Sequence, residues 1–414
     1  MKFRRASFIA TTLLLLLSLR AQAQAQPGSD TSLPPHAAPS QAQPGEVLWY
    51  GKAPPGLDEG VGPMKLVAPG VGWAQRGRRL YWTSDNCTSW KDITPPIDIG
   101  AVFFLDTQKG WAAADNGGRS PSSDDLPLEV ASTTDAGANW SVTHVSLSLK
   151  DYDLSHNDVS HYETEPISFA DTSHGWMDVR VDGQTMNLQW NFLLVTSNGG
   201  RTWRPAPSVP YLVDADVLLV TPTESWMIGG EGGATDKLYF TLDGAKSWKE
   251  VSLAAPNEIL PADQPAYDLP VFEGTKRGFV AVTYTGDGVN SAAVLFATED
   301  GGRTWRPDRI VKKLGSDSPG QTLQSAMAGS AWVTAIASDG LMLSTLGPRA
   351  RVNAARADWR SFRPLQLSMI SPTHGWLLTS NGKLLSTTNG GATWTTITPG
   401  PQPHIIDPVN APAR

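Results

Sequence analysis

The stretch Thr298-Glu299-Asp300-Gly301-Gly302-Arg303-Thr304-Trp305 decides the fold, because it is the clearest copy of a box that recurs along the chain. The box reads Thr-x-Asp/Asn-x-Gly-x-Ser/Thr-Trp. Other copies end at Trp90, Trp140, Trp203, Trp248 and Trp394. A degenerate seventh copy starts at Ser344 and closes at Trp359, with a basic insertion in place of the turn.

A second series, Gly-Trp or a close variant, precedes each box by about half a repeat. Its members begin at Gly72, Gly110, Gly175, Ser225, Gly278, Ala331 and Gly375. Successive box tryptophans lie 35 to 63 residues apart, the length of one supersecondary unit with loops of variable length. The two series together indicate a circular array of seven units.

Each unit alternates short apolar runs with Gly, Asn, Asp and Pro, a pattern typical of four short β-strands. One such sheet cannot bury both of its faces, whereas sheets arranged radially can. We therefore expect an all-β fold, a single seven-bladed β-propeller of four-stranded blades over residues 46–400.

The box has a mechanical explanation in the turn that it forms. Its third residue can accept hydrogen bonds from turn N–H groups, and glycine supplies the positive φ that such a turn needs. The structural acceptors are Asp85, Asp135, Asn198, Asp243, Asp300 and Asn389. The tryptophans expected to pack inward and form the core are Trp90, Trp140, Trp203, Trp248, Trp305 and Trp394.

The box is similar to the Asp-box, or bacterial neuraminidase (BNR) repeat. Combined with the Gly-Trp series, it resembles the photosystem II stability/assembly factor family of seven-bladed β-propellers. The last unit, from Ser371 to Trp394, carries the resemblance best. The resemblance implies a non-catalytic scaffold that binds a protein partner such as a subunit of an envelope or membrane complex.

The N-terminus has the layout of a secretory signal peptide. A basic start is followed by an apolar run to Leu19 and by Ala21-Gln22-Ala23, a small-residue cleavage site. We expect residues 1–23 to be the signal peptide, 24–45 a disordered tether and 401–414 a C-terminal tail. The protein would then be exported to the periplasm or the extracellular space, or to a lumen in a photosynthetic host.

Composition narrows the class of partner. A net charge of −7 and a pI of about 5.5 argue against nucleic acid and against an anionic membrane surface. The lone Cys87 forms no intrachain disulfide and occupies a turn position. No motif for a metal or cofactor is visible, so we expect neither, and we expect a monomer.

Three insertions, residues 114–129, 148–166 and 181–190, are expected on one face of the ring. The middle one is rich in acidic residues and imidazoles. The candidate ligand-face residues are Tyr152, His156, His161, Tyr162 and Trp190. A metal or ligand site and a solvated acidic loop are the two interpretations, because the spacing matches no metal signature.

The degenerate box is basic, in contrast to the acidic middle insertion. Its candidate partner-binding residues are Arg349, Arg351, Arg356, Arg360 and Arg363. Such a cluster can dock an acidic partner surface, although a charge run is also typical of a solvated loop.

A glycan-binding protein or a glycoside hydrolase is the alternative function, because Asp-boxes also occur in sialidases and xyloglucanases. Sialidases share a Phe/Tyr-Arg-Ile-Pro motif near the start of the chain. The nearest match is Phe362-Arg363-Pro364, which lacks the isoleucine and lies near the opposite end. With no catalytic residues identified, the sequence favours a non-catalytic protein.

Overall fold

The computed structural model describes residues 61–115, 120–185, 188–210, 213–230, 237–257, 264–285, 292–312, 323–328, 331–336, 341–346, 353–356, 364–371 and 373–397. All of them belong to one compact unit, Val47–Arg414. The predicted signal peptide, tether and tail lie outside these residues and stay predictions. Within the described ranges the chain has no helix with the length and apolar character required to span a bilayer.

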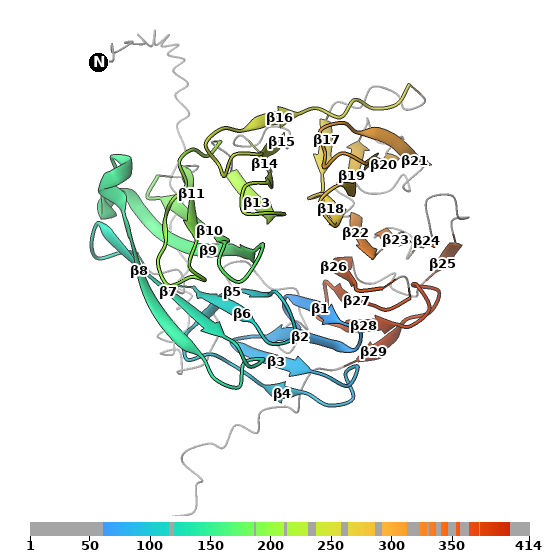
Figure 1. Ribbon diagram of the computed structural model, residues 1–414, viewed down its shortest axis with the longest axis horizontal. Helices are drawn as coiled ribbons and strands as arrows, with labels where there is room; N and C mark the ends of the chain where they lie inside the picture. The colour runs from blue at the N-terminus through green and yellow to red at the C-terminus, as the bar shows by residue number, and fades with distance from the viewer. Residues whose placement is uncertain are drawn as a thin grey trace, which may run out of the picture. The chain divides into compact units, whose positions relative to one another are not determined.

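The described chain is almost entirely β-structure, in antiparallel sheets of consecutive strands (Figure 1). The first sheet comprises β1 (Met64–Ala68), β2 (Val71–Arg76), β3 (Arg79–Thr83) and β4 (Lys91–Asp92). The next comprises β5 (Ile99–Phe104), β6 (Gly110–Ala114), β7 (Asp125–Thr133) and β8 (Ser141–Ser148). Two 3-10 helices, η1 (Leu149–Tyr152) and η2 (His156–Asp158), lead into β9 (Val159–Phe169), β10 (Gly175–Gly183), β11 (Gln189–Thr196) and β12 (Arg204–Pro205).

Four further sheets follow in chain order. One contains β13 (Val213–Leu219), β14 (Ser225–Gly230), β15 (Lys237–Thr241) and β16 (Lys249–Val251). Another contains β17 (Gln264–Tyr267), β18 (Val271–Glu273), β19 (Arg277–Thr285), β20 (Ala292–Thr298) and β21 (Arg306–Lys312). The last two are β22 (Leu323–Ala328), β23 (Ala331–Ile336), β24 (Leu341–Leu346) and β25 (Asn353–Arg356), then β26 (Pro364–Met369), β27 (Gly375–Thr379), β28 (Leu384–Thr387) and β29 (Thr395–Ile397).

The strand count corrects the expected architecture. In the described part of the chain six sheets have four strands and form four-stranded blades, but the β17–β21 sheet has five strands. There β17 and β18 both pair with the long strand β19, because Pro270 between them has no N–H to continue a single strand. The fold is an all-β propeller with six four-stranded blades, and the expectation of seven such blades is wrong.

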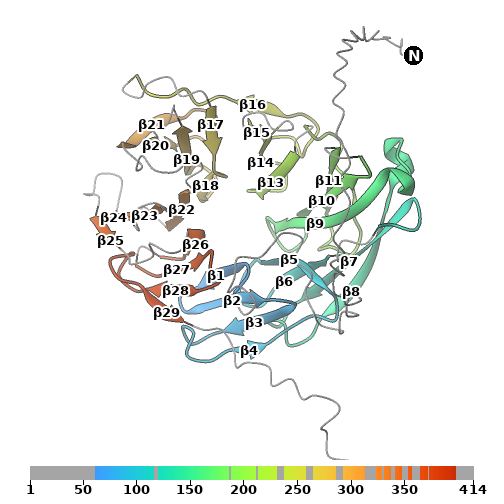
Figure 2. The same ribbon diagram turned by 180° about the vertical axis from the view of Figure 1, so that it is seen from behind.

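Contacts between the last and first sheets close the array of sheets. The backbone N–H of Met64 donates to Oε1 of Gln366 at 3.0 Å, and that of Leu66 donates to Oγ of Ser368 at 3.2 Å. These bonds join β1 to β26, which lie side by side in both views (Figures 1 and 2). The side chains of β26 thereby satisfy backbone donors of β1 that its own sheet leaves without a strand partner.

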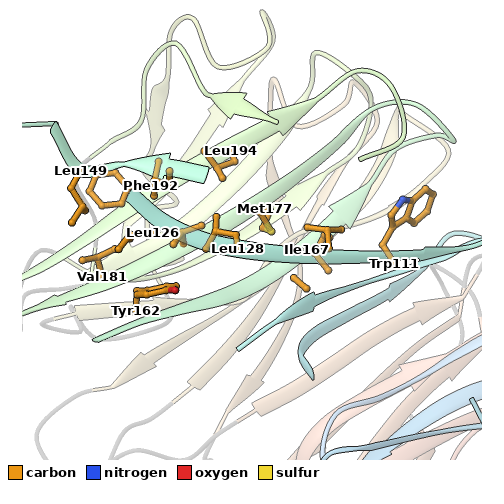
Figure 3. Close-up of a cluster of buried hydrophobic side chains, with 14 of the residues drawn as sticks. Trp111, Leu126, Leu128, Leu149, Tyr162, Ile167, Met177, Val181, Phe192 and Leu194 are labelled. Carbon is orange, nitrogen blue, oxygen red and sulfur yellow. The ribbon is translucent and has the colours of Figure 1, made fainter. Parts of the chain in front are cut away.

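Apolar side chains fill the spaces between neighbouring sheets. The cluster between the β5–β8 and β9–β12 sheets includes Met177, Val179 and Val181, which alternate along β10 and are fully buried (Figure 3). Each such side chain stabilises the fold by about 1.5–3 kcal/mol as an upper estimate. The period of two places them on one face of β10. The other face carries Trp176, which is buried in a separate cluster, followed by Asp178, Arg180 and Asp182.

The sequence predicts that the box indoles form the core, but the other tryptophan series is the more deeply buried. The most deeply buried indoles belong to the Gly-Trp series, with only 1–4% exposed at Trp73, Trp111, Trp176, Trp226 and Trp376. The box indoles are half-buried. Two of them pack edge-on against the first series: Trp305 against Trp226 of the preceding sheet at a ring separation of 5.7 Å, and Trp248 against Trp176 at 5.9 Å. The core is therefore built by both series in contact.

The box turns form as predicted. Oδ1 of Asp300 accepts the backbone N–H of Thr304 at 2.9 Å, and Oγ1 of Thr298 accepts that of Gly302 at 2.9 Å. The equivalent bonds to the acceptor residue occur at Asp85, Asp135, Asn198, Asp243 and Asn389. The degenerate turn that ends at Trp359 lies outside the described residues.

Candidate functional site

The predicted insertions form long strands and short helices and are not irregular loops. Strands β7 to β11 have eight to eleven residues each, against six in β2 and five in β3. Residues 148–166 supply η1, η2 and most of β9. We call residues 120–128, 145–163 and 180–191, apart from the undescribed 186 and 187, the projection.

One face of the projection is apolar and continues the core. Tyr162 is only 5% exposed, and its hydroxyl donates to the carbonyl of Pro127 at 2.9 Å. Trp190 packs half-buried against the same cluster, and the ring of Tyr152 lies 4.3 Å from that of Phe192. Strand register turns the ring of Tyr162 inward. Tyr152 on η1 and Trp190 on β11 are half-buried, and their part in a ligand face stays a prediction.

The opposite face of β9, β10 and β11 carries a network of paired charges. Nη2 of Arg180 lies 2.7 Å from Oε2 of Glu163. Nε2 of His161 lies 2.7 Å from Oδ2 of Asp182, whose Oδ1 accepts a hydrogen bond from Gln189 at 2.8 Å. All are partly exposed, so the network forms a polar surface.

Ser160 extends the His161–Asp182 pair and also bonds to the sheet backbone. Its Oγ lies 3.2 Å from Nδ1 of His161, which gives the serine–histidine–aspartate order of a hydrolase triad. The same hydroxyl donates to the backbone carbonyl of Asp182 at 3.1 Å. This bond ties Ser160 into the sheet between β9 and β10.

A second network anchors η1 and η2. Oδ1 of Asp124 accepts the backbone N–H of His156 at 2.9 Å and lies 2.6 Å from its Nδ1, while Lys150 lies 3.2 Å from Oδ2. The hydrogen bonds from His156, then that from Lys150, hold the pKa of Asp124 far below its usual value. Ser155 and Asp158 form a capping box at η2.

The acidic and imidazole side chains of the projection pair with one another. In the described residues no group of three or more His, Cys, Asp or Glu side chains is placed to hold an ion. The carboxylates nearest His156 and His161 are those of Asp124 and Asp182, and each bonds to its imidazole.

Sequence reasoning missed a buried acid at the base of this face. Asp178 is 2% exposed, and burial raises its pKa to about 8; Asn191 opposes the shift by donating to Oδ2 at 2.7 Å, and Asp216 adds to it. Burial and Asp216 also raise the pKa of Asp268 to about 7. The only sequence signal was an acid in the alternating run Trp176-Met177-Asp178-Val179.

Cys87 occupies the expected turn position, with φ of 70°. Its backbone N–H donates to Oγ1 of Thr83 at 3.0 Å. Burial, followed by the nearby charge of Asp85, raises the pKa of the thiol to about 12. Such a thiol is protonated and unreactive at neutral pH.

The basic cluster stays a prediction. The backbone of Arg356 ends β25 and pairs with Leu341. Arg349, Arg351, Arg360 and Arg363 lie outside the described residues.

The fold and these networks define an all-β propeller with a polar projection on adjacent sheets. No protein-family model matches the chain, and no curated relative matches it. Among solved structures, YCF48 bound to D1 peptide is 21% identical, covering 72% of this chain and 81% of its own, with a TM-score of 0.45. YCF48 from Cyanidioschyzon merolae is 16% identical, covering 75% and 88%, with a TM-score of 0.46.

An enzyme also matches. The Niastella koreensis GH74 enzyme is 11% identical, covering 81% of this chain and 62% of its own, with a TM-score of 0.32. At these identities the matches describe the fold alone, and propellers of one fold serve both as enzymes and as binding proteins.

Proposed function

We propose that this chain is an exported, non-catalytic propeller that binds another protein, as an assembly factor or scaffold for an envelope or membrane complex. The resemblance of the box and Gly-Trp series to photosystem II assembly factors motivates this class. YCF48 bound to a D1 peptide is an example of a propeller that holds a peptide. Export follows from the signal-like N-terminus.

The observation that carries the proposal is the state of the titratable groups on the projection. The pairs Arg180–Glu163, His161–Asp182 and Asp124–His156 bond to each other at 2.6–2.7 Å. Paired, ordered charges on a partly exposed surface suit recognition of a protein, where they confer specificity.

A glycan-binding surface usually offers exposed aromatic rings, and the candidate ligand face has few of them. Tyr162 is buried, and Tyr152 and Trp190 pack half-buried against the core that joins the β5–β8 and β9–β12 sheets. Asp171, a partly exposed carboxylate outside the projection, accepts the backbone N–H groups of Ser173 and His174 within a turn.

Affinity capture from the organism's own envelope extract tests the function, with a glycan array on the same preparation. Asp151→Arg places a new charge on η1 of the projection, and Asp308→Arg makes the same change on β21 as a control; both residues are exposed. We expect one stoichiometric partner, lost with Asp151→Arg and kept with Asp308→Arg. A glycan signal without a protein partner would contradict the proposal.

A further inference from the structure

The outer edge of the β5–β8 sheet differs from the other outer edges. Strand β8 ends the order β5-β6-β7-β8 and has eight residues. The outer strands β4, β12, β16, β25 and β29 have two to four residues. A short outer strand offers little backbone for another chain to pair with, whereas a long one offers a template.

Strand β8 is regular along its whole length. It pairs with β7 from Ser132↔Ser141 to Asp125↔Ser148, eight consecutive pairs without a bulge. Within the described ranges no strand pairs with its other side. One row of N–H and C=O groups along β8 therefore points away from its sheet.

Strand β8 also lacks the features that protect exposed edges. Its sequence, Ser-Val-Thr-His-Val-Ser-Leu-Ser, has no proline, lysine, arginine or carboxylate. The other long outer strand, β21, contains Pro307, three basic residues and Asp308, and its pairing with β20 is interrupted by a bulge. Charges, proline and bulges are the means by which proteins block pairing at an edge.

The two faces of β8 indicate what side chains an added strand would carry. Leu147 is buried and Val145 packs against the core cluster, so the added strand would extend this side with small apolar residues. On the other side a shallow hollow of about 370 Å³ is lined by Ser122, Ser123, Asp125, Pro127, His144, Val145 and Ser146.

The charge around the hollow indicates which kind of side chain would bind there. Asp125 is exposed in its lining, and Glu129 lies four residues further along the same strand, 3.3 Å from His144. Asp124, the residue before Asp125, is paired with Lys150 and His156, so Asp125 is the carboxylate that faces an occupant. A second copy of this chain, with net charge −7, would bring like charges together. A lysine or arginine side chain would meet opposite charge.

We propose that the free edge of β8 binds an extended peptide of a protein partner by strand addition, with a lysine or arginine of that peptide in the hollow beside Asp125. This inference rests on the proposed function and names the surface and the chemistry of its partner. Backbone hydrogen bonds would supply affinity, and the hollow would supply specificity.

Synthetic peptides test the proposal on the full mature chain. The probe is the fluorescein-labelled nonapeptide Ser-Val-Thr-Val-Lys-Val-Thr-Val-Ser, compared with peptides carrying Glu in place of Lys or N-methyl groups on alternate residues. We expect saturable binding of the Lys peptide, about tenfold weaker binding of the Glu peptide and none of the N-methylated peptide. Hydrogen exchange should slow at residues 141–148 when the Lys peptide binds.

Two lysine variants separate the β8 edge from other outer strands. Ser146→Lys adds a positive charge to the exposed side of β8, and Thr395→Lys adds one to an exposed position of the short outer strand β29. We expect Ser146→Lys to weaken binding of the Lys peptide at least about tenfold. Thr395→Lys should leave it unchanged.

Three outcomes would overturn the proposal: no binding of the Lys peptide, equal binding of the N-methylated peptide, or equal effects of the two variants. Dimerisation through β8, seen by sedimentation and abolished by Ser146→Lys, would assign the edge to a second copy instead. If envelope capture of a partner persists with Ser146→Lys, the proposed function stands and the β8 surface does not.

Discussion

At the scale of single residues, the box glycine serves two purposes. Gly302 has φ of 80°, and a Cβ added there would collide with the Trp226 indole of the preceding sheet. Ala245 holds the equivalent place in another box with φ of 65°, so the left-handed conformation alone does not demand glycine. The close approach of the neighbouring indole adds the stronger constraint at Gly302.

We therefore predict that Gly302→Ala lowers the free energy of unfolding by about 2–4 kcal/mol, through backbone strain and displacement of Trp226. Gly274→Ala is the matched control, because Gly274 has φ of 65° and no atom within 4 Å of an added Cβ. The control should cost about 1 kcal/mol. Equal losses in urea unfolding would show that the indole does not fill this space.

The buried carboxyl of Asp178 predicts a pH dependence. Its pKa in the fold is about 8, against 3.8 ordinarily, so the folded state holds a proton that the unfolded state releases. Stability from this group is fully present below about pH 4, falls as pH rises toward 8 and is constant above that. Asp268, with a pKa of about 7, acts in the same direction.

Asp178→Asn keeps an oxygen for Asn191 and removes the titration. We expect the variant to be about 2 kcal/mol more stable than the native chain at pH 8, with a smaller difference at pH 5. Denaturant unfolding at several pH values measures this, and Asp151→Asn on the surface serves as the control. A pH-independent difference would mean that Asp178 does not titrate in this range.

At the scale of elements, the sequence predicts the box turns and the strands that flank them, because their signals are local. The projection was predicted as loops since its polar residues, His161, Glu163 and Asp182, read as a solvated segment. In the structure they occupy one side of strands whose other side, including Tyr162, is core. Which side faces inward depends on register against β7 and β10, and no local signal in the residues gives it.

Substitutions of Tyr162 test whether this side of the strands faces the core. We predict that Tyr162→Phe lowers the free energy of unfolding by about 1 kcal/mol, because the carbonyl of Pro127 loses its donor. Tyr162→Ala should cost about 3–5 kcal/mol through the cavity that it leaves. Thermal and urea unfolding of both variants measure the effect, and a neutral Tyr162→Ala would place the ring in solvent.

At the scale of the whole molecule, closure joins residues some 300 positions apart, and only the recurrence of the motifs indicated it in the sequence. Trp376 of the last sheet lies against Gly72 and Trp90 of the first. The five-stranded sheet could not be predicted in the same way, because Pro270 splits the pairing partner of β19 inside a repeat whose other signals are ordinary.

The hydrogen bonds that join β26 to β1 can be tested by removing their acceptors. Gln366→Leu together with Ser368→Ala removes the acceptors for the N–H groups of Met64 and Leu66. Each unsatisfied donor costs about 1–3 kcal/mol, so the pair should lower the free energy of unfolding by about 2–6 kcal/mol. Hydrogen exchange in β1 should accelerate more than exchange in β7.

Gln184→Leu is the control, since its side chain donates to the carbonyl of Val159 far from the closure. It should leave exchange in β1 unchanged. If the double variant destabilises the chain while β1 keeps its protection, apolar contacts such as Trp376 against Trp90 hold the closure without these hydrogen bonds, because β1 can then exchange only when the whole propeller unfolds.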